Sequence, residues 1–205
     1  MLSDLPLQDI IIVLLSLVFS LGIHEATHAF VAHRLGDNTA YEEGRLTLNP
    51  LKHIDVITTV ALPAVLMLLH LPPILIAKPV PIDSGQVKHG EYGLAAVALA
   101  GPFSNLALAV VASILLHLGI AGFLGHILVL FMLLNVGLFV FNMLPIPPLD
   151  GSRLLYAFAP EPVQRVMQQI EALGFMFLII ILLALSSFIS PIISYLNQFV
   201  IGFLV

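Results

Sequence analysis

The string His24-Glu25-Ala26-Thr27-His28 combines residue types and a spacing that suit metal-dependent hydrolysis. Residues four positions apart lie on one face of a helix, so His24 and His28 could bind a single metal ion through their imidazole nitrogens. Glu25 borders the same face and could accept a proton from the attacking water. The string therefore predicts a catalytic site with one zinc ion (Zn2+). The alternative is a pair of histidines buried in a helix bundle without a metal.

A third protein ligand is needed, because catalytic zinc usually has three protein ligands and one open position. The chain has no cysteine, so this ligand must be a histidine, an aspartate or a glutamate. Asp150 is the best candidate, since it follows an apolar segment and stands beside Gly151. The same position also suits a simple N-cap of a short helix over 151–158.

The composition limits the class of protein that could carry this site. The chain has 205 residues, of which 60% are hydrophobic and 9% are charged, and its mean hydropathy is +1.09. Soluble domains contain roughly a quarter charged residues, so a water-soluble protein is excluded and a lipid bilayer is the expected surrounding. A formal net charge of −5 argues against nucleic acid as a partner.

Apolar segments predict an all-α polytopic membrane protein with about five to six transmembrane helices. They lie at about 10–35, 56–77, 92–118, 124–144, 170–185 and 189–205. The first has an acidic flank, which indicates a retained span and not a cleaved signal peptide. Three prolines in the second favour a re-entrant segment, with full spanning as the alternative, and Pro191 leaves open whether the last segment spans fully.

Segment 45–48 alternates polar and apolar residues between Gly44 and Asn49-Pro50, which predicts a short strand or hairpin.

The topology of these segments bears on Asp150. If the first span enters the cytoplasm and 56–77 is re-entrant, Asp150 emerges on the same side as the histidines. All seven lysines and arginines then face the cytoplasm, as the positive-inside rule expects. If 56–77 crossed the membrane fully, Asp150 would lie on the far side. The charge pattern favours the first arrangement, with the active site toward the cytoplasmic side.

Three sequence blocks together resemble the site-2 protease family of intramembrane zinc metalloproteases. They are the string at 24–28, Ala100-Gly101-Pro102-Phe103-Ser104-Asn105, and Asn142-Met143-Leu144-Pro145-Ile146-Pro147-Pro148-Leu149-Asp150-Gly151. The resemblance covers about residues 10–160. It implies zinc ligands at His24, His28 and Asp150, and the catalytic base at Glu25. It also implies a substrate-positioning or oxyanion-stabilising role for Asn142, with Asn105 in the same neighbourhood.

The resemblance also sets expectations for the whole chain. Residues 1–205 would form a single integral-membrane protease domain, with a catalytic core at 10–160 and C-terminal transmembrane helices at 161–205. The PDZ and CBS domains of larger members are not expected, and the strand near 45–48 would be a membrane-associated β-element that meets the substrate. The substrate would be a transmembrane protein cleaved in regulated intramembrane proteolysis, and the location a plasma membrane. The natural substrate, the cleavage position, the upstream signal and the oligomeric state cannot be read from the sequence.

Two other functions use similar residues. A divalent-metal or proton transporter also places histidines and carboxylates inside the membrane, but the sequence has no internal repeat and no relay along one span. A non-catalytic scaffold with a structural zinc would need a fourth protein ligand, and the sequence suggests none.

Overall fold

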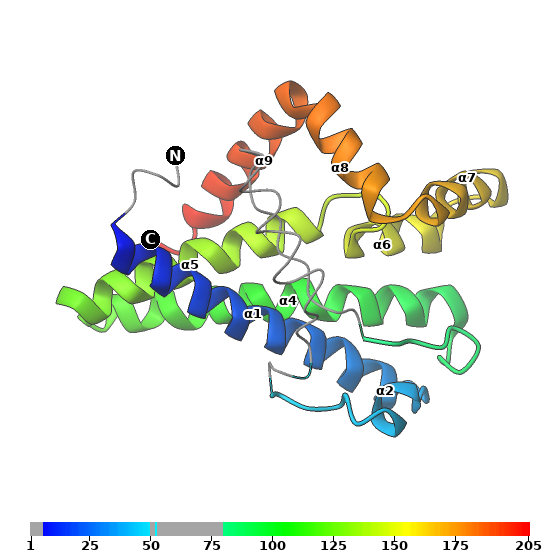
Figure 1. Cartoon of the computed structure of the whole chain (residues 1–205), viewed down its shortest axis with the longest axis horizontal. Helices are drawn as coiled ribbons and strands as arrows, with labels where there is room; N and C mark the ends of the chain where they lie inside the picture. The colour runs from blue at the N-terminus through cyan, green and yellow to red at the C-terminus, as the bar shows by residue number, and fades with distance from the viewer. Residues whose placement is uncertain (1–5, 50–51, 53–79) are drawn as a thin grey trace.

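The computed structural model describes residues 6–49, 52 and 80–205, and the regular structure in this part of the chain is helical (Figure 1). The helices are α1 (Leu7–Arg34), α2 (Thr39–Glu42), α4 (Gly90–His117), α5 (Gly122–Asn142), α6 (Asp150–Phe158), α7 (Glu161–Ala172), α8 (Gly174–Ala184) and α9 (Ser186–Ile201).

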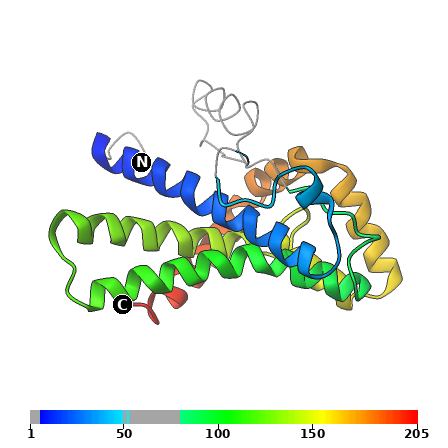
Figure 2. The same cartoon turned by 90° about the horizontal axis from the view of Figure 1, so that it is seen from below.

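Helices α1, α4 and α5 are long and apolar enough to cross a membrane. Both α1 and α4 contain 28 residues, which corresponds to about 42 Å of helix, against roughly 30 Å for the hydrocarbon core of a bilayer. Figure 2 shows α4 and α5 as an antiparallel pair with α1 lying across them. The chain is therefore a multi-pass membrane protein.

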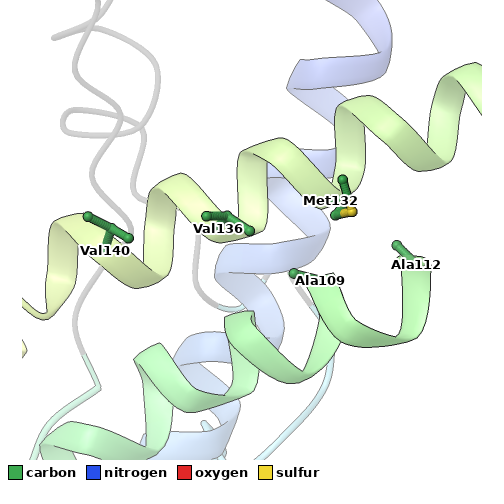
Figure 3. Close-up of a cluster of buried hydrophobic side chains, with 5 residues drawn as sticks. All are labelled: Ala109, Ala112, Met132, Val136 and Val140. Atoms are coloured by element: carbon green, nitrogen blue, oxygen red, sulfur yellow. The ribbon is translucent and has the colours of Figure 1, made fainter. Parts of the chain in front are cut away.

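Small residues allow α4 to approach α5 closely. Ala109 and Ala112 of α4 face Met132, Val136 and Val140 of α5 (Figure 3), and all five side chains are buried. Small side chains at such a contact bring the helix backbones together, and van der Waals packing then holds helices that lie in lipid. The α4–α5 pair thus forms a closely packed unit, which α1 contacts.

The C-terminal helices extend this core. Side chains of α9 pack against the α4–α5 cluster, among them Ile193, Leu196 and Val200. Leu178 of α8 is fully buried against Leu144 and Leu149 in the connection from α5 to α6. This connection is therefore covered by protein where it leads to Asp150.

The expectation of five to six spans is not confirmed. Within the described residues there are three candidate spans, or up to four if the pair formed by 161–172 and 177–184, bent by 100°, counts as one span. α8 has 11 residues and α9 has 16, and each is shorter than the roughly 20 residues that a straight span needs. The predicted re-entrant segment 56–77 lies outside the described residues.

The predicted strand at 45–48 is not found, because the backbone there follows the turn that ends α2. The amide of Arg45 donates to the carbonyl of Ala40 at 2.8 Å, and Gly44 adopts a φ of 65°. The amide of Asn49 donates to the hydroxyl of Thr47 at 3.1 Å. Alternating side chains predict a strand only where a neighbouring strand takes up the backbone groups, and these two amides have local partners.

Candidate metal centre

His24 and His28 lie on the same face of α1, as their spacing predicts, and both are buried. Their Nε2 atoms are 3.0 Å apart, and the two rings meet edge to face with centroids 4.6 Å apart. Both histidines lie in the second half of a helix that can span the bilayer. Ionisable groups at such depth are costly to bury, so they point to a functional site.

Asp150 reaches the two histidines from the first residue of α6. Its Oδ2 lies 3.1 Å from Nε2 of His24 and 3.5 Å from Nε2 of His28. The three ligand atoms lie within 4.8 Å of one another. The N-cap of α6 is Leu149, and no side chain caps the helix. Asp150 therefore directs its carboxylate at the histidines, and the alternative of a plain N-cap does not hold.

Two glycines make these close approaches possible. A Cβ on Gly101 of α4 would lie 2.6 Å from Nε2 of His24 and closer still to His28. A Cβ on Gly151 would lie 2.5 Å from the carbonyl carbon of Met143 and 2.9 Å from the carbonyl oxygen of Leu144. The first glycine lets the α4 backbone border the histidines. The second lets α6 begin against the end of α5, which places Asp150.

The second nitrogen of each histidine has a partner on α4. Nδ1 of His28 lies 2.7 Å from the carbonyl of Val97, and Nδ1 of His24 lies 2.6 Å from Oδ1 of Asn105. A carbonyl oxygen can only accept, so Nδ1 of His28 carries the hydrogen and its Nε2 presents a lone pair. Metal-binding histidines are usually oriented in this way.

The donor set fits a catalytic zinc ion. Two imidazole nitrogens and one carboxylate oxygen converge in a buried place, and three such ligands leave a coordination position open for water or substrate. An aspartate binds metal in its ionised form, and Asp150 presents one carboxylate oxygen to the two histidines.

Glu25 is held by a segment that is distant in sequence. The backbone amide of Val80 donates to Oε2 of Glu25 at 2.9 Å. The side chain of Val80 packs with Ala29, one turn further along α1, and with Ala40 of α2. The segment that begins at Val80 thus borders α1 beside the histidines and fixes one oxygen of the carboxylate.

The two expected asparagines have different positions. Asn105 is fully buried, and its side chain bonds to His24 and to Asn135 of α5. Asn142 is the last residue of α5 and donates to the carbonyl of Leu138 at 2.9 Å. Among the described residues, no hydrogen bond joins Asn142 to His24, His28 or Asp150.

The sequence reasoning missed Asn135 and Val80. A signal for Asn135 was present, because it is an amide inside an otherwise apolar segment that could span the membrane. No comparable local signal marks Val80.

Comparisons with known proteins bear on the family of the chain. The sequence model of peptidase family M50 matches residues 120–185. The protein named "Putative zinc metalloprotease YwhC" from Bacillus subtilis (strain 168) is 36% identical over 200 residues, which cover 90% of this chain and 86% of the relative. "Putative zinc metalloprotease Rip2" from Mycolicibacterium smegmatis is 32% identical over 189 residues, which cover 84% of this chain and 67% of the relative. No solved structure gives a significant match. With this identity over nearly the whole length of a relative, the chain belongs to peptidase family M50.

Proposed function

We propose that this protein is an intramembrane zinc metalloendopeptidase, which hydrolyses peptide bonds within or near the transmembrane segments of other proteins. The observation that carries the proposal is the convergence of His24, His28 and Asp150 on one point, with the histidines on a helix that can span the bilayer. Membership of a peptidase family and relatives named as zinc metalloproteases support the reaction class.

The proposed roles follow from the atoms that face the cluster. Nε2 of His24, Nε2 of His28 and Oδ2 of Asp150 would hold the zinc ion. When bound, zinc supplies a Lewis acid that polarises the scissile carbonyl and lowers the pKa of water to about 7. Glu25 would accept the proton of the attacking water and later deliver it to the leaving amine. The amide of Val80 would keep the Glu25 carboxylate in position for both transfers.

Asn142 is the proposed substrate contact. It ends α5 where the connection to Asp150 begins. Its amide uses one hydrogen for the carbonyl of Leu138, which leaves a second donor for a substrate carbonyl or a developing oxyanion. Such a donor contributes roughly 3 kcal/mol to transition-state stabilisation.

The depth of the cluster supports cleavage inside the membrane. His28 precedes the last residue of α1, Arg34, by six positions, which is about 9 Å along a helix axis. A substrate chain must therefore leave its own helix and enter the protein to reach Glu25. The proposed substrates are transmembrane proteins that unwind easily near the cleaved bond.

Charge supports an active site that faces the cytoplasm, and we propose a plasma membrane as the location. Arg34 ends α1, Lys88 precedes α4 and Arg153 lies in α6, so these cations lie at the end of the molecule that holds the cluster. Asp9 near the start of α1 and His126 near the start of α5 pair at 2.8 Å at the opposite end. The positive-inside rule places the cationic end in the cytoplasm.

The test compares wild type with Glu25→Gln in detergent, using a reporter substrate with one transmembrane segment. Zinc should be retained in both proteins, while cleavage should be lost in the variant because glutamine cannot accept the proton. Glu91→Gln is the matched control, since Glu91 is an exposed carboxylate at the start of α4. Continued cleavage by Glu25→Gln would refute the assignment. If the protein carried metal ions into vesicles and did not cleave the reporter, the alternative function of a divalent-metal transporter would be favoured.

A further inference from the structure

A line of side-chain amides runs from the metal centre into the core of the three long helices. Nδ1 of His24 on α1 lies 2.6 Å from Oδ1 of Asn105 on α4. Nδ2 of Asn105 donates to Oδ1 of Asn135 on α5 at 3.0 Å. Nδ2 of Asn135 donates to the carbonyl of Phe131, one turn earlier on α5, at 2.9 Å. These three consecutive bonds connect three helices that can span the membrane.

The last acceptor fixes the direction of every bond in the line. A backbone carbonyl can only accept, so Asn135 must direct its NH2 group at Phe131 and its oxygen at Asn105. Asn105 must then direct its NH2 group at Asn135 and its oxygen at His24. An oxygen that faces Nδ1 requires a hydrogen on that nitrogen. Nε2 of His24 is thereby left with the lone pair that a metal ligand needs.

The burial of the two amides shows that reversing the line would be costly. Asn105 and Asn135 are each 0% exposed, so water cannot replace a lost partner. If the amide of Asn105 were turned around, its oxygen would face the oxygen of Asn135. If Asn135 turned as well, its oxygen would face the carbonyl of Phe131. Either arrangement leaves buried polar atoms unpaired, which costs free energy.

We propose that Asn135 is a positioning residue for the metal site: through Asn105 it holds His24 in the tautomer with hydrogen on Nδ1 and its Nε2 directed at the bound zinc. This inference rests on the proposed function, because it assumes that His24 is a zinc ligand. Among the described residues, no hydrogen bond joins Asn135 to His24, His28 or Asp150, so it acts on His24 through Asn105. Loss of Asn135 should therefore lower zinc affinity directly and should lower catalysis as a consequence of that.

The experiment measures the zinc dissociation constant of the full-length protein in detergent, by competition with a chelator of known affinity. Asn135→Leu removes the side-chain amide that fixes the direction of the hydrogen bonds through Asn105 to His24. Zinc binding should then weaken by roughly tenfold to a hundredfold, as it does when a hydrogen-bond partner of a metal ligand is lost. Asn135→Asp is the rescue, because burial without a counter-charge keeps a carboxyl protonated. A neutral carboxyl has one oxygen that accepts from Asn105 and one O–H that donates to Phe131, so the zinc dissociation constant should stay within about threefold of wild type.

Two control variants distinguish the effect of His24 orientation on zinc affinity from the effect of helix packing. Val136→Ala leaves a cavity beside Asn135 at a fully buried position, so it should lower the melting temperature without changing zinc affinity. Ser113→Ala removes a bond from α4 to the carbonyl of Leu204 in the turn after α9, so it tests the loss of a tertiary hydrogen bond away from the site and should leave zinc affinity unchanged. Unchanged affinity in Asn135→Leu would overturn the proposal. Equal weakening in Asn135→Leu and Val136→Ala would also overturn it, because packing alone would then explain the effect.

If Asn135→Leu fails to fold, a measurement on the wild type tests the proposed tautomer of His24. Nitrogen-15 spectra of the zinc-free protein with labelled histidine report which ring nitrogen carries the hydrogen, and His24→Gln identifies the signals of His24. Hydrogen on Nδ1 is expected, and hydrogen on Nε2 would refute the proposal. Failure of the proposed function is distinguishable, since it would be seen as wild-type protein that binds no zinc or as cleavage by Glu25→Gln.

Discussion

Gly101 on α4 lies directly against the imidazole of His24. A Cβ added to Gly101 would stand 2.6 Å from Nε2, the nitrogen that faces Asp150. The neighbouring residue is Pro102, which is buried inside α4 and cannot donate to the helical carbonyl of Ala98. The glycine in the middle of this spanning helix thus has a physical reason, because it lets the backbone approach the histidines where a side chain would displace them.

Gly101→Ala should therefore lose zinc while the chain still folds. Alanine favours a helix over glycine by about 1 kcal/mol, so a general loss of helix stability is not expected. The added methyl group would push both rings away from Asp150. Gly137→Ala is the matched control, because a Cβ at Gly137 on α5 meets nothing within 4 Å. Metal analysis of the purified proteins checks the prediction, and normal zinc content in Gly101→Ala would contradict it.

Asp150→Ala should lower zinc affinity strongly, because it removes the only carboxylate of the cluster found among the described residues. The loss should be about a hundredfold or more, since it exceeds what the loss of an outer partner causes. Asp83→Ala is the control, because Asp83 is an exposed aspartate whose side chain bonds locally to Gly85 and Gln86. Chelator competition measures both variants. Unchanged affinity in Asp150→Ala would remove Asp150 from the ligands.

Local patterns predicted the parts of the site that depend on one helix. The positions of His24 and His28 follow from a four-residue spacing on a single helix, which survives any tertiary arrangement. The meeting of Asp150 with the histidines could also be anticipated, because the positions of charged residues limit the topologies of a membrane protein. In that case the prediction concerned which side of the membrane a residue reaches, and it did not require knowledge of packing.

Features that depend on contacts between distant segments could not be predicted. Alternation at 45–48 does not reveal whether another strand is present, and the backbone of Arg45 completes the turn after α2 instead. An apolar run in the sequence does not show where the chain bends. The run at 170–185 contains such a bend, because a turn at Gly174, with a φ of 68°, divides α7 from α8. The bond between Val80 and Glu25 joins residues that are 55 positions apart, and no local pattern encodes it.

Val80→Pro should impair catalysis without affecting zinc binding. Proline has no N–H, so Glu25 would lose the donor that holds its carboxylate, while an apolar ring would still contact Ala29. Loss of positioning of this kind lowers kcat by roughly tenfold to a hundredfold. Ile82→Pro is the control, because it places a proline in the same segment without touching the Glu25 bond. Cleavage kinetics on the reporter test the prediction, and an unchanged kcat would exclude a role for the Val80 amide.

The last prediction concerns Asp37, which joins the end of α1 to the segment that carries Val80. Its carboxylate is fully buried. Oδ1 accepts from the amide and hydroxyl of Thr39 at 2.9 and 2.6 Å, and Oδ2 accepts from the amide of Asp83 at 2.9 Å. Asp37→Ala would remove three hydrogen bonds from half-buried or exposed residues, each worth about 1 kcal/mol. The segment from Val80 to Asp83 should then loosen.

Asp37→Ala should thus lower both the melting temperature and kcat and leave zinc affinity unchanged, because neither α1 nor α6 depends on Asp37 to hold the ligands. Faster cutting by an added protease within 80–89 would locate the loosening. Asp9→Ala is the matched control: Asp9 is a buried aspartate in the first turn of α1 whose partner, His126, lies at the opposite end of the molecule. Its loss should lower the melting temperature and spare kcat. If both variants reduced kcat to the same degree, general destabilisation would explain the effect, and the connection from Asp37 through Val80 to Glu25 would be rejected.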